Sequence, residues 1–319
     1  MDFHNFKREQ FEKRALQTFH RQAENNPVYR EFIRLLKIHP ADVKKPGEIP
    51  FLPIELFKTH EIKTGSFSPR IVFESSGTTA ATSSRHFVKN ATLYENSFIK
   101  AFEMFYGNPR DFCFLALLPS YLERGGSSLV YMCQKLIEKS NYRQSGFFLN
   151  DYPKLVETLH QNEQENVPTV LIGVSFALLD LAENHPMPLK NTIIMETGGM
   201  KGRRAEITRT ELHHRLQSAF HLKDIHSEYG MTELLSQAYS KGNGIFHPPP
   251  WMKIFFREIN DPLTLTKKSG GINIIDLANV DSCAFIATGD LGRLHPSGGF
   301  EILGRLDNSD VRGCNLMVT

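Results

Sequence analysis

Short, continuous apolar runs alternate with amphipathic patterns from about residue 90 to residue 246. The clearest apolar runs are 112–118, 170–174 and 192–195. A strand that is apolar on both faces must be covered on both faces, which is typical of a parallel sheet between helices. The stretches between the runs have helical periodicity. The expected helices are 91–105, 129–138, 154–163, 176–182 and 205–220. The alternation therefore predicts an α/β fold.

The two ends of the chain differ in the secondary structure that their sequences predict. Residues 3–38 have helical character that Asn26-Pro27 divides into two helices, and a proline-rich connector follows at 45–53. After Trp251, short strands separated by Gly, Asp and Pro turns predict a small β-rich subdomain. These strands are expected at 252–259, 272–277, 283–287 and 300–303. We therefore expect three regions: N-terminal helices and connector (1–69), an α/β core (70–250) and a β-rich subdomain (251–319).

Composition narrows the class of protein. The chain has 319 residues and a net charge of +2, which gives no reason to expect nucleic acid or an anionic membrane as partner. Its four cysteines are far apart, which argues against a disulfide framework or a zinc site and favours a reducing compartment. No apolar run has the length of a membrane span and the N-terminus lacks a signal-peptide core, so we expect a cytoplasmic protein.

Small hydroxyl residues surround a single glycine directly after the apolar run Ile71-Val72-Phe73, which reads as the end of a strand. Glycine lets a backbone approach phosphate oxygens closely, short hydroxyl side chains add donors, and Arg85 adds charge. The segment predicts a phosphate-binding loop made by Ser75, Ser76, Gly77, Thr78 and Thr79. A flexible Ser/Thr-rich surface loop is the alternative. The Walker pattern is absent from the sequence.

A second informative segment runs from His226 to Glu233, after a short apolar run and before a stretch with helical character. Ligand loops of α/β sheets usually lie at such positions. Tyr229 offers a flat face to a base, Gly230 permits a tight turn, and Glu233 offers a carboxylate to Mg²⁺. An ordinary capped helix is the alternative.

Two further segments lie near the C-terminus. In Thr288-Gly289-Asp290, at the end of an expected strand, the carboxylate could accept hydrogen bonds from ribose hydroxyls, and a plain β-turn is the alternative. The segment from Gly304 to Cys314 contains Arg305 and Arg312, either of which could neutralise phosphate charge. A solvated terminal loop is the alternative there.

A competing pattern is Gly173-Val174-Ser175-Phe176-Ala177, which follows a strand and precedes a helix as a hydrolase nucleophile elbow does. It has Ala where the last Gly of that motif belongs. Asp290 and His295 follow in a permissible order. The thirteen histidines show no metal-ligand spacing.

The order of the four segments is more specific than any one of them. Together they resemble the core motifs of the adenylate-forming enzymes, over residues of about 70 to 313. Within that superfamily, 118–128 and the ending Arg312-Gly313-Cys314 resemble the acyl-protein synthetases of the luciferase fatty-acid reductase system (LuxE type). Phenylacetate-CoA ligases are the next most similar relatives. The resemblance implies a layered N-terminal adenylate-forming domain without the C-terminal cap domain, since five residues follow Cys314.

The resemblance also implies an ATP and Mg²⁺ site and a role for each motif. Phosphate contacts would come from Ser75, Ser76, Gly77, Thr78, Thr79 and Arg85, and the adenine pocket would include Gly198, Gly199, Tyr229 and Gly230. Thr232 would contact the α-phosphate and Glu233 would bind Mg²⁺. Asp290 would bind the ribose, and Arg305 would reach ribose or phosphate.

The implied reaction is activation of a carboxylic acid, such as a long-chain fatty acid, to an acyl-adenylate. Cys314 would then accept the acyl group and pass it to a reductase or another acceptor protein. Three alternatives stay open: a ligase that uses CoA or a carrier protein, an ATP-independent acyltransferase or esterase that uses Ser175, and a non-catalytic nucleotide-binding protein.

Overall fold

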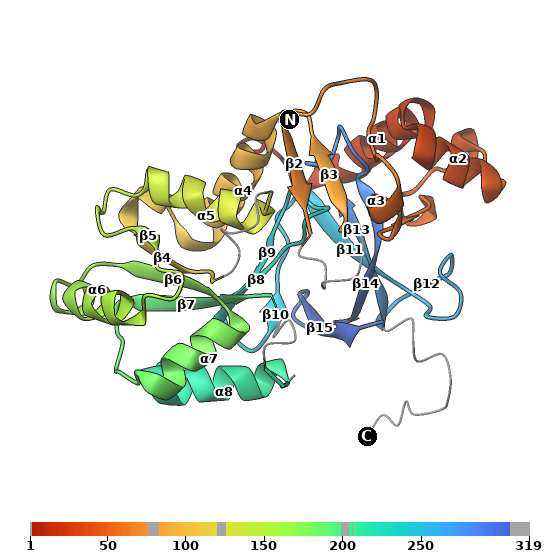
Figure 1. The fold of residues 1–319 in the computed structure, drawn as a ribbon. Helices are drawn as coiled ribbons and strands as arrows, with labels where there is room; N and C mark the ends of the chain where they lie inside the picture. Colours follow the sequence, from red (N-terminus) through yellow and green to blue (C-terminus); the bar gives the residue numbers. More distant parts are fainter. Residues whose placement is uncertain (1, 76–82, 120–125, 199–203, 206, 307–319) are drawn as a thin grey trace.

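The computed structural model describes residues 2–75, 83–119, 126–198, 204–205 and 207–306 (Figure 1). A largely parallel sheet forms one half of the molecule, in the order β5-β4-β6-β7-β8-β9, and β9 is antiparallel to β8. Helices α4 and α5 lie on one side of this sheet and α7 and α8 on the other (Figure 1). The expected α/β fold is therefore confirmed.

The strands of this sheet match the apolar runs of the sequence. They are β4 (Cys113–Leu117), β5 (Gly146–Phe147), β6 (Thr169–Val174), β7 (Thr192–Thr197), β8 (His226–Tyr229) and β9 (Ala238–Ser240). Every residue of β4 and of β6 is buried, as continuous apolar runs require when helices cover both faces.

The helices also follow the expected positions closely. They are α1 (Phe11–Asn25), α2 (Pro27–Leu35), α3 (Leu56–Thr59), α4 (Ala91–Tyr106), α5 (Ser128–Lys139), α6 (Tyr152–Gln164), α7 (Ser175–Asn184) and α8 (Arg209–Phe220). The break at Asn26-Pro27 is confirmed: Pro27 opens α2, and the Asn26 side chain caps it by accepting a hydrogen bond from the Tyr29 amide. Helix α8 begins at Arg209, four residues after the expected start.

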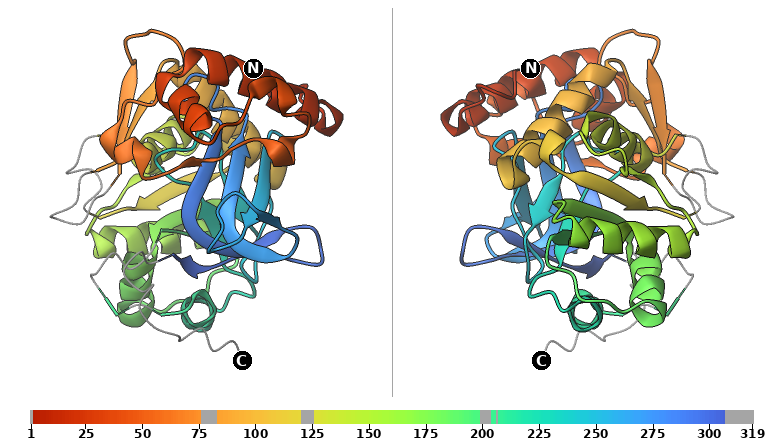
Figure 2. Two further views of the ribbon diagram at one scale, coloured as in Figure 1. Left: turned by 90° about the vertical axis from the view of Figure 1, so that its right-hand side faces the viewer. Right: turned by 90° about the vertical axis from the view of Figure 1, so that its left-hand side faces the viewer.

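A second sheet holds the β-rich part of the chain, in the order β10-β15-β14-β13-β11-β12. Its strands are β10 (Ile245–Phe246), β11 (Met252–Arg257), β12 (Leu265–Thr266), β13 (Ser269–Asp276), β14 (Phe285–Leu294) and β15 (Phe300–Arg305). Strand β1 (Leu52–Pro53) adds to β14 in parallel, so the N-terminal connector is built into this sheet. Helices α1 and α2 lie against it (Figure 2), where the Gln22 side chain donates to the Asn279 carbonyl at 3.0 Å.

Strands β2 (Ile71–Glu74) and β3 (Arg85–Val88) form a separate antiparallel hairpin. It frames residues 76–82 of the Ser/Thr-rich segment, which lie outside the described residues.

Two expectations from the sequence were wrong. Thr288-Gly289-Asp290 is not a turn at a strand end but lies inside β14, a ten-residue strand paired with β13 and β15. The stretch after Tyr229 is not a helix either, because residues 230–237 form turns that lead directly into β9. Around Asp290, pairing with Arg305 of β15 prevails over the local turn propensity of Gly and Asp. No helix in the described part of the chain is long and apolar enough to cross a membrane.

Candidate functional site

The carboxyl ends of three parallel strands lie side by side. Strands β6, β7 and β8 end at Val174, Thr197 and Tyr229, and Thr197 is directly opposite Glu228 in the ladder. The residue after β7 is Gly198, whose φ of 73° is a left-handed conformation that glycine adopts without strain. Open α/β sheets bind ligands at this edge. Gly199 lies outside the described residues.

Tyr229 connects this edge to the β-rich sheet. Its hydroxyl donates a hydrogen bond to Asp290 Oδ2 at 2.7 Å, while its ring packs edge-on against Phe246 and Phe300. Burial, followed by the nearby Asp290 carboxylate, raises the pKa of Tyr229 well above its ordinary value, so the phenol stays a donor. Two segments that are 61 residues apart in sequence thus meet at a direct hydrogen bond.

Asp290 also faces a cation. It is the cross-strand partner of Arg305, and the Arg305 Nε lies 3.5 Å from Asp290 Oδ1. The Arg305 side chain is 83% exposed, whereas that of Asp290 is 12% exposed. The carboxylate is therefore fixed at the base of the site, and the guanidinium is accessible to a ligand from solvent.

A buried arginine supports the strand segment before Asp290. The Arg257 guanidinium donates to the Thr288 carbonyl at 2.6 Å, and the Thr288 hydroxyl accepts from the Asp290 amide at 3.1 Å. Burial lowers the pKa of Arg257 from its ordinary value, although Glu55 and Asp290 act in the opposite direction. These hydrogen bonds hold the backbone of the strand segment that carries the buried Asp290 carboxylate.

The ends of the Ser/Thr-rich segment are tied together. The Ser75 amide donates to the Ser84 carbonyl at 3.0 Å, and the Ser84 amide donates to Ser75 Oγ at 2.9 Å. The Glu74 amide also donates to the Gly126 carbonyl at 2.8 Å. The Ser75 hydroxyl oxygen therefore helps to close the stem of the segment. The predicted phosphate ligands Ser76, Gly77, Thr78 and Thr79 lie outside the described residues.

Arg85 lies at the start of β3 and is exposed. Its guanidinium carbon lies 5.5 Å from the centre of the Phe87 ring, and Lys63 Nζ lies at the same distance from that ring. The Arg85 guanidinium thus lies over this aromatic ring. Its predicted phosphate contact stays a prediction.

The backbone of Thr232 and Glu233 is held from two directions. His86 Nδ1 lies 2.8 Å from the Thr232 carbonyl oxygen, and Asn279 Nδ2 donates to the Glu233 carbonyl at 2.7 Å. The Glu233 side chain is itself buried, at 5% exposure, and burial raises its pKa. Contacts with the Ser84 hydroxyl and the charges of Arg305 and Lys58 act in the opposite direction. The charge of Arg305 therefore acts on the Glu233 carboxyl group.

The donor set around Glu233 fits Mg²⁺ in one specific way. Magnesium is commonly held by one or two carboxylates together with substrate phosphates. Within the described residues, no cluster of three or more His, Cys, Asp or Glu side chains could hold a metal ion by itself. Glu233 offers a single carboxylate, and the charge of Arg305 acts on it. The arrangement fits an ion that arrives with a nucleotide.

Glu228, which the sequence analysis did not single out, is a buried carboxyl group in β8. Burial raises its pKa to about 7, although the hydrogen bond that Thr197 Oγ1 donates to Oε2 at 2.5 Å acts in the opposite direction. Gly230 leaves room for it, since a Cβ there would clash with Glu228 Oε1. Perturbed carboxyl groups of this kind are frequent at functional sites.

The serine-nucleophile alternative gains no support from the described contacts. Ser175 is buried, and its hydroxyl donates to the Gly198 carbonyl at 2.8 Å. Asp290 accepts from Tyr229, and His295 Nδ1 contacts Ser297 Oγ at 2.8 Å. The expected partners of Ser175 are thus engaged elsewhere.

Sequence reasoning also missed His86, Asn279 and Arg257. No local pattern distinguishes them, because their roles depend on burial and on contacts between distant segments. The one available signal was the position of His86 immediately after Arg85, two residues after the end of the hydroxyl-rich stretch.

Comparisons with known proteins support the fold. No protein-family model matches the sequence, and no curated protein matches it. Among solved structures, ATP-bound MatB from Rhodopseudomonas palustris is similar with a TM-score of 0.56 and 16% identity, over 75% of this chain and 49% of that one. The amide bond synthetase McbA from Marinactinospora thermotolerans has a TM-score of 0.53 and 16% identity, over 77% and 50%.

A third similar structure is O-succinylbenzoate coenzyme A synthetase from Bacillus subtilis in complex with ATP and magnesium ion. Its TM-score is 0.50 at 18% identity, over 73% of this chain and 49% of that one. The chain thus shares the α/β fold of part of these structures, and it spans about half their length.

Proposed function

We propose that this protein activates a carboxylic acid by forming an acyl-adenylate from ATP. The observation that carries the proposal is the cluster of Tyr229, Asp290 and Arg305 at the carboxyl end of the parallel sheet. These three residues come from three of the four motif segments, and the charge of Arg305 also acts on Glu233. Its occurrence in a fold shared with ATP-bound proteins favours a nucleotide as ligand.

Each group has a role that suits its chemistry. Asp290 would accept hydrogen bonds from the ribose hydroxyls, and the exposed Arg305 would neutralise phosphate charge. Glu233 would hold Mg²⁺, which when bound supplies neutralisation of the phosphate oxygens. Thr232 would donate to the α-phosphate, and Tyr229 with Gly198, Gly199 and Gly230 would line the adenine pocket. Ser75, Ser76, Gly77, Thr78, Thr79 and Arg85 would surround the terminal phosphates.

The first half-reaction follows from these roles. A carboxylate oxygen attacks the α-phosphorus, a new P–O bond forms, and the bond from the α-phosphorus to the bridging oxygen breaks. Pyrophosphate leaves with that electron pair. Arg305 opposes the charge that develops on the phosphates, and preorganised charge of this kind is usually the largest catalytic contribution.

For the second half-reaction we propose Cys314 as the acyl acceptor. Its thiolate would attack the acyl carbonyl and release AMP, and Arg312 nearby would favour the thiolate. Both residues lie outside the described residues. The described cysteines are poor candidates: Cys113, Cys133 and Cys283 are all buried, and burial raises the pKa of Cys283 to about 12.

The motif Arg312-Gly313-Cys314 favours a long-chain fatty acid as substrate and a reductase or carrier protein as final acceptor, through its resemblance to acyl-protein synthetases. A cytoplasmic location fits free, buried thiols.

ATP–pyrophosphate exchange across a panel of carboxylic acids tests the adenylation step. The proposal expects exchange that depends on Mg²⁺ and on one class of acid, greatest for long-chain fatty acids. Tight ATP binding with no exchange for any acid would instead identify a non-catalytic nucleotide-binding protein. Ester turnover without nucleotide, lost in Ser175→Ala, would identify a serine enzyme.

The acyl acceptor is tested separately. The protein is incubated with ATP, Mg²⁺ and radiolabelled tetradecanoate, and hydroxylamine-labile label on the protein is measured. We expect labelled wild type and unlabelled Cys314→Ser, with Cys283→Ser as a labelled control. AMP release that requires added CoA, with no label on the protein, would select a CoA ligase.

A further inference from the structure

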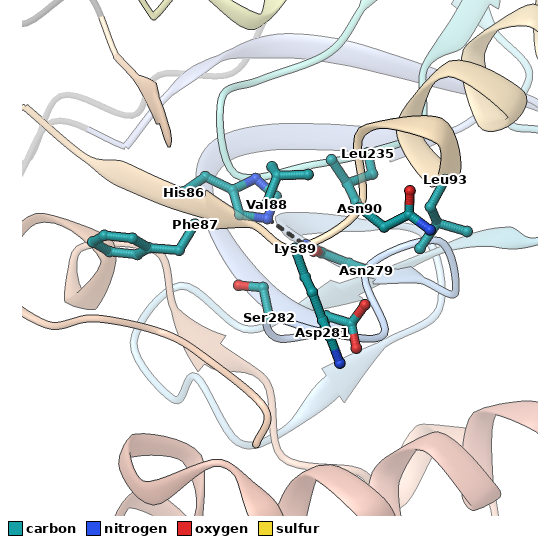
Figure 3. Close-up of a pocket in the computed structure, with 10 residues that line it drawn as sticks. All are labelled: His86, Phe87, Val88, Lys89, Asn90, Leu93, Leu235, Asn279, Asp281 and Ser282. Carbon is teal, nitrogen blue, oxygen red and sulfur yellow. Dashed lines mark hydrogen bonds between the residues drawn. The ribbon is translucent and has the colours of Figure 1, made fainter. Parts of the chain in front are cut away.

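His86 and Asn279 form a buried bridge between the hairpin that frames the Ser/Thr-rich segment and the Thr232-Glu233 backbone. Figure 3 shows the two side chains meeting, with His86 Nε2 3.0 Å from Asn279 Oδ1. They are 1% and 0% exposed. One end of the bridge contacts the Thr232 carbonyl through His86, and the other contacts the Glu233 carbonyl through Asn279.

The bridge comes from well-anchored elements. His86 lies on β3, where its ring packs edge-on against Phe57 of α3 at 6.0 Å. Asn279 lies in the connection between β13 and β14, where its backbone carbonyl accepts from the buried Gln22 side chain of α1. The segment that the bridge holds has no helix or strand of its own between residues 230 and 237. Rigid parts of the fold therefore fix a segment without regular structure.

Ser84, which immediately precedes β3, adds a second link. Its hydroxyl contacts the Glu233 carboxylate, and its backbone closes the stem with Ser75. Ser84 and His86 are both buried, whereas Arg85 between them is exposed. The stem of the Ser/Thr-rich segment is thus attached directly to Thr232 and Glu233.

Hydrogen-bond chemistry makes the bridge unusual. The Glu233 carbonyl can only accept a hydrogen bond, so the Asn279 NH₂ group faces it and Asn279 Oδ1 faces His86. The Thr232 carbonyl, on the other side of the ring, can also only accept. Burial lowers the pKa of His86 to about 4, so the ring carries one N–H at neutral pH but faces two acceptors. A buried ring that can donate to only one of its two partners needs an explanation, and functional sites are where such arrangements are expected.

We propose that His86 and Asn279 are positioning residues, which fix Thr232 and Glu233 relative to the phosphate-binding stem for the nucleotide reaction. This inference rests on the proposed function for its catalytic consequence. Its structural part, that the bridge immobilises residues 231–237, stands independently. Outer partners that orient the groups around a metal typically contribute roughly 10- to 100-fold to metal affinity or activity.

The test combines amide hydrogen exchange with kinetics in the full-length chain. Asn279→Asp keeps the size of the side chain and the oxygen that faces His86, but it removes the N–H donor to the Glu233 carbonyl. His86→Gln replaces the imidazole ring that contacts the Thr232 carbonyl. Asn26→Asp is the matched control, because Asn26 is also buried and its Nδ2 donates to a backbone carbonyl, that of Ser282, at 3.0 Å.

We expect amides of residues 231–237 to exchange roughly ten-fold faster or more in Asn279→Asp and His86→Gln, while β4 and β6 keep their protection. The KM for Mg-ATP should rise or kcat should fall by roughly ten-fold or more, with the KM for the acid unchanged. Asn26→Asp should change neither the exchange of residues 231–237 nor the KM for Mg-ATP nor kcat.

Unchanged exchange at 231–237 in both folded variants would overturn the inference. So would faster exchange that is equal over the whole chain, which would indicate a purely structural role. Local exchange effects in a protein whose wild type shows no ATP–pyrophosphate exchange would support the bridge and refute the proposed function.

Discussion

The Tyr229 hydroxyl donates a hydrogen bond to Asp290 Oδ2 at 2.7 Å, across the junction of the two sheets. One residue ends a parallel strand and the other lies inside an antiparallel strand, so the bond is one of the contacts that join the two sheets. It also orients the Asp290 carboxylate, whose Oδ1 faces Arg305.

Tyr229→Phe should weaken ATP binding. The change removes one donor to Asp290, so we expect the KM for ATP to rise roughly three- to ten-fold and stability to fall by about 1–2 kcal/mol. Tyr29→Phe is the control, since its buried hydroxyl donates to the Pro50 carbonyl at 2.6 Å, away from the site. It should lose similar stability with no change in KM. Equal KM changes in both variants would contradict the role of the Tyr229–Asp290 bond.

Arg305→Ala should impair function without impairing the fold. Its side chain is 83% exposed, so we expect little change in thermal stability but a roughly 5- to 30-fold rise in the KM for ATP, as for a lost charged hydrogen bond. Arg293→Ala is matched to it, because Arg293 is also exposed and pairs with Glu301 at 2.7 Å across the same two strands. If the two variants bind ATP equally well, Arg305 does not contact the nucleotide.

Glu228 should make stability depend on pH near neutrality. Folding raises its pKa from an ordinary value of 4.5 to about 7, so between these values the native state binds more protons than the unfolded state. The contribution is fully present below about pH 4.5 and is lost as pH rises through about 7, by roughly 3 kcal/mol in total. Denaturant unfolding should therefore show that the free energy of unfolding of Glu228→Gln increases relative to that of the wild type between pH 5 and pH 8. Parallel pH profiles of the two proteins would disprove this burial effect.

Gly230→Ala should be destabilising because of Glu228. The added Cβ would clash with Glu228 Oε1, at a cost of about 1–3 kcal/mol. In Glu228→Ala the same change should cost less, with a coupling of about 1 kcal/mol or more in a double-mutant cycle. Gly146→Ala, where a Cβ meets no atom within 4 Å, is the control. If the stability changes of Gly230→Ala and Glu228→Ala simply add, the added Cβ does not clash with Glu228.

Much of the fold could be predicted from local chemistry. The buried runs of β4 and β6 and the Asn26-Pro27 helix break follow from apolar patterning and capping, which act within a few residues. Asp290 was predicted as a candidate ligand but was placed in a turn, since Gly and Asp favour turns when considered alone. Pairing with Arg305 of β15 keeps it inside a strand instead.

The candidate site was predictable in its motifs but not in its supports. Tyr229 and Arg305 lie in sequence motifs, and their side chains have an evident chemistry for binding a nucleotide. His86 and Glu228 acquire their properties only from burial by segments that are distant in sequence, and no local pattern encodes that burial. Such groups become visible only when the tertiary contacts are known.

Transfer of oxygen from the acid to AMP tests the central claim most directly. The acid that supports pyrophosphate exchange is labelled with ¹⁸O in both carboxylate oxygens and incubated with ATP, Mg²⁺ and the protein, and hydroxylamine is added to release AMP. If a carboxylate oxygen attacks the α-phosphorus, mass spectrometry should find one ¹⁸O atom in the phosphate of AMP. AMP without label, or formation of ADP and labelled orthophosphate, would contradict acyl-adenylate formation.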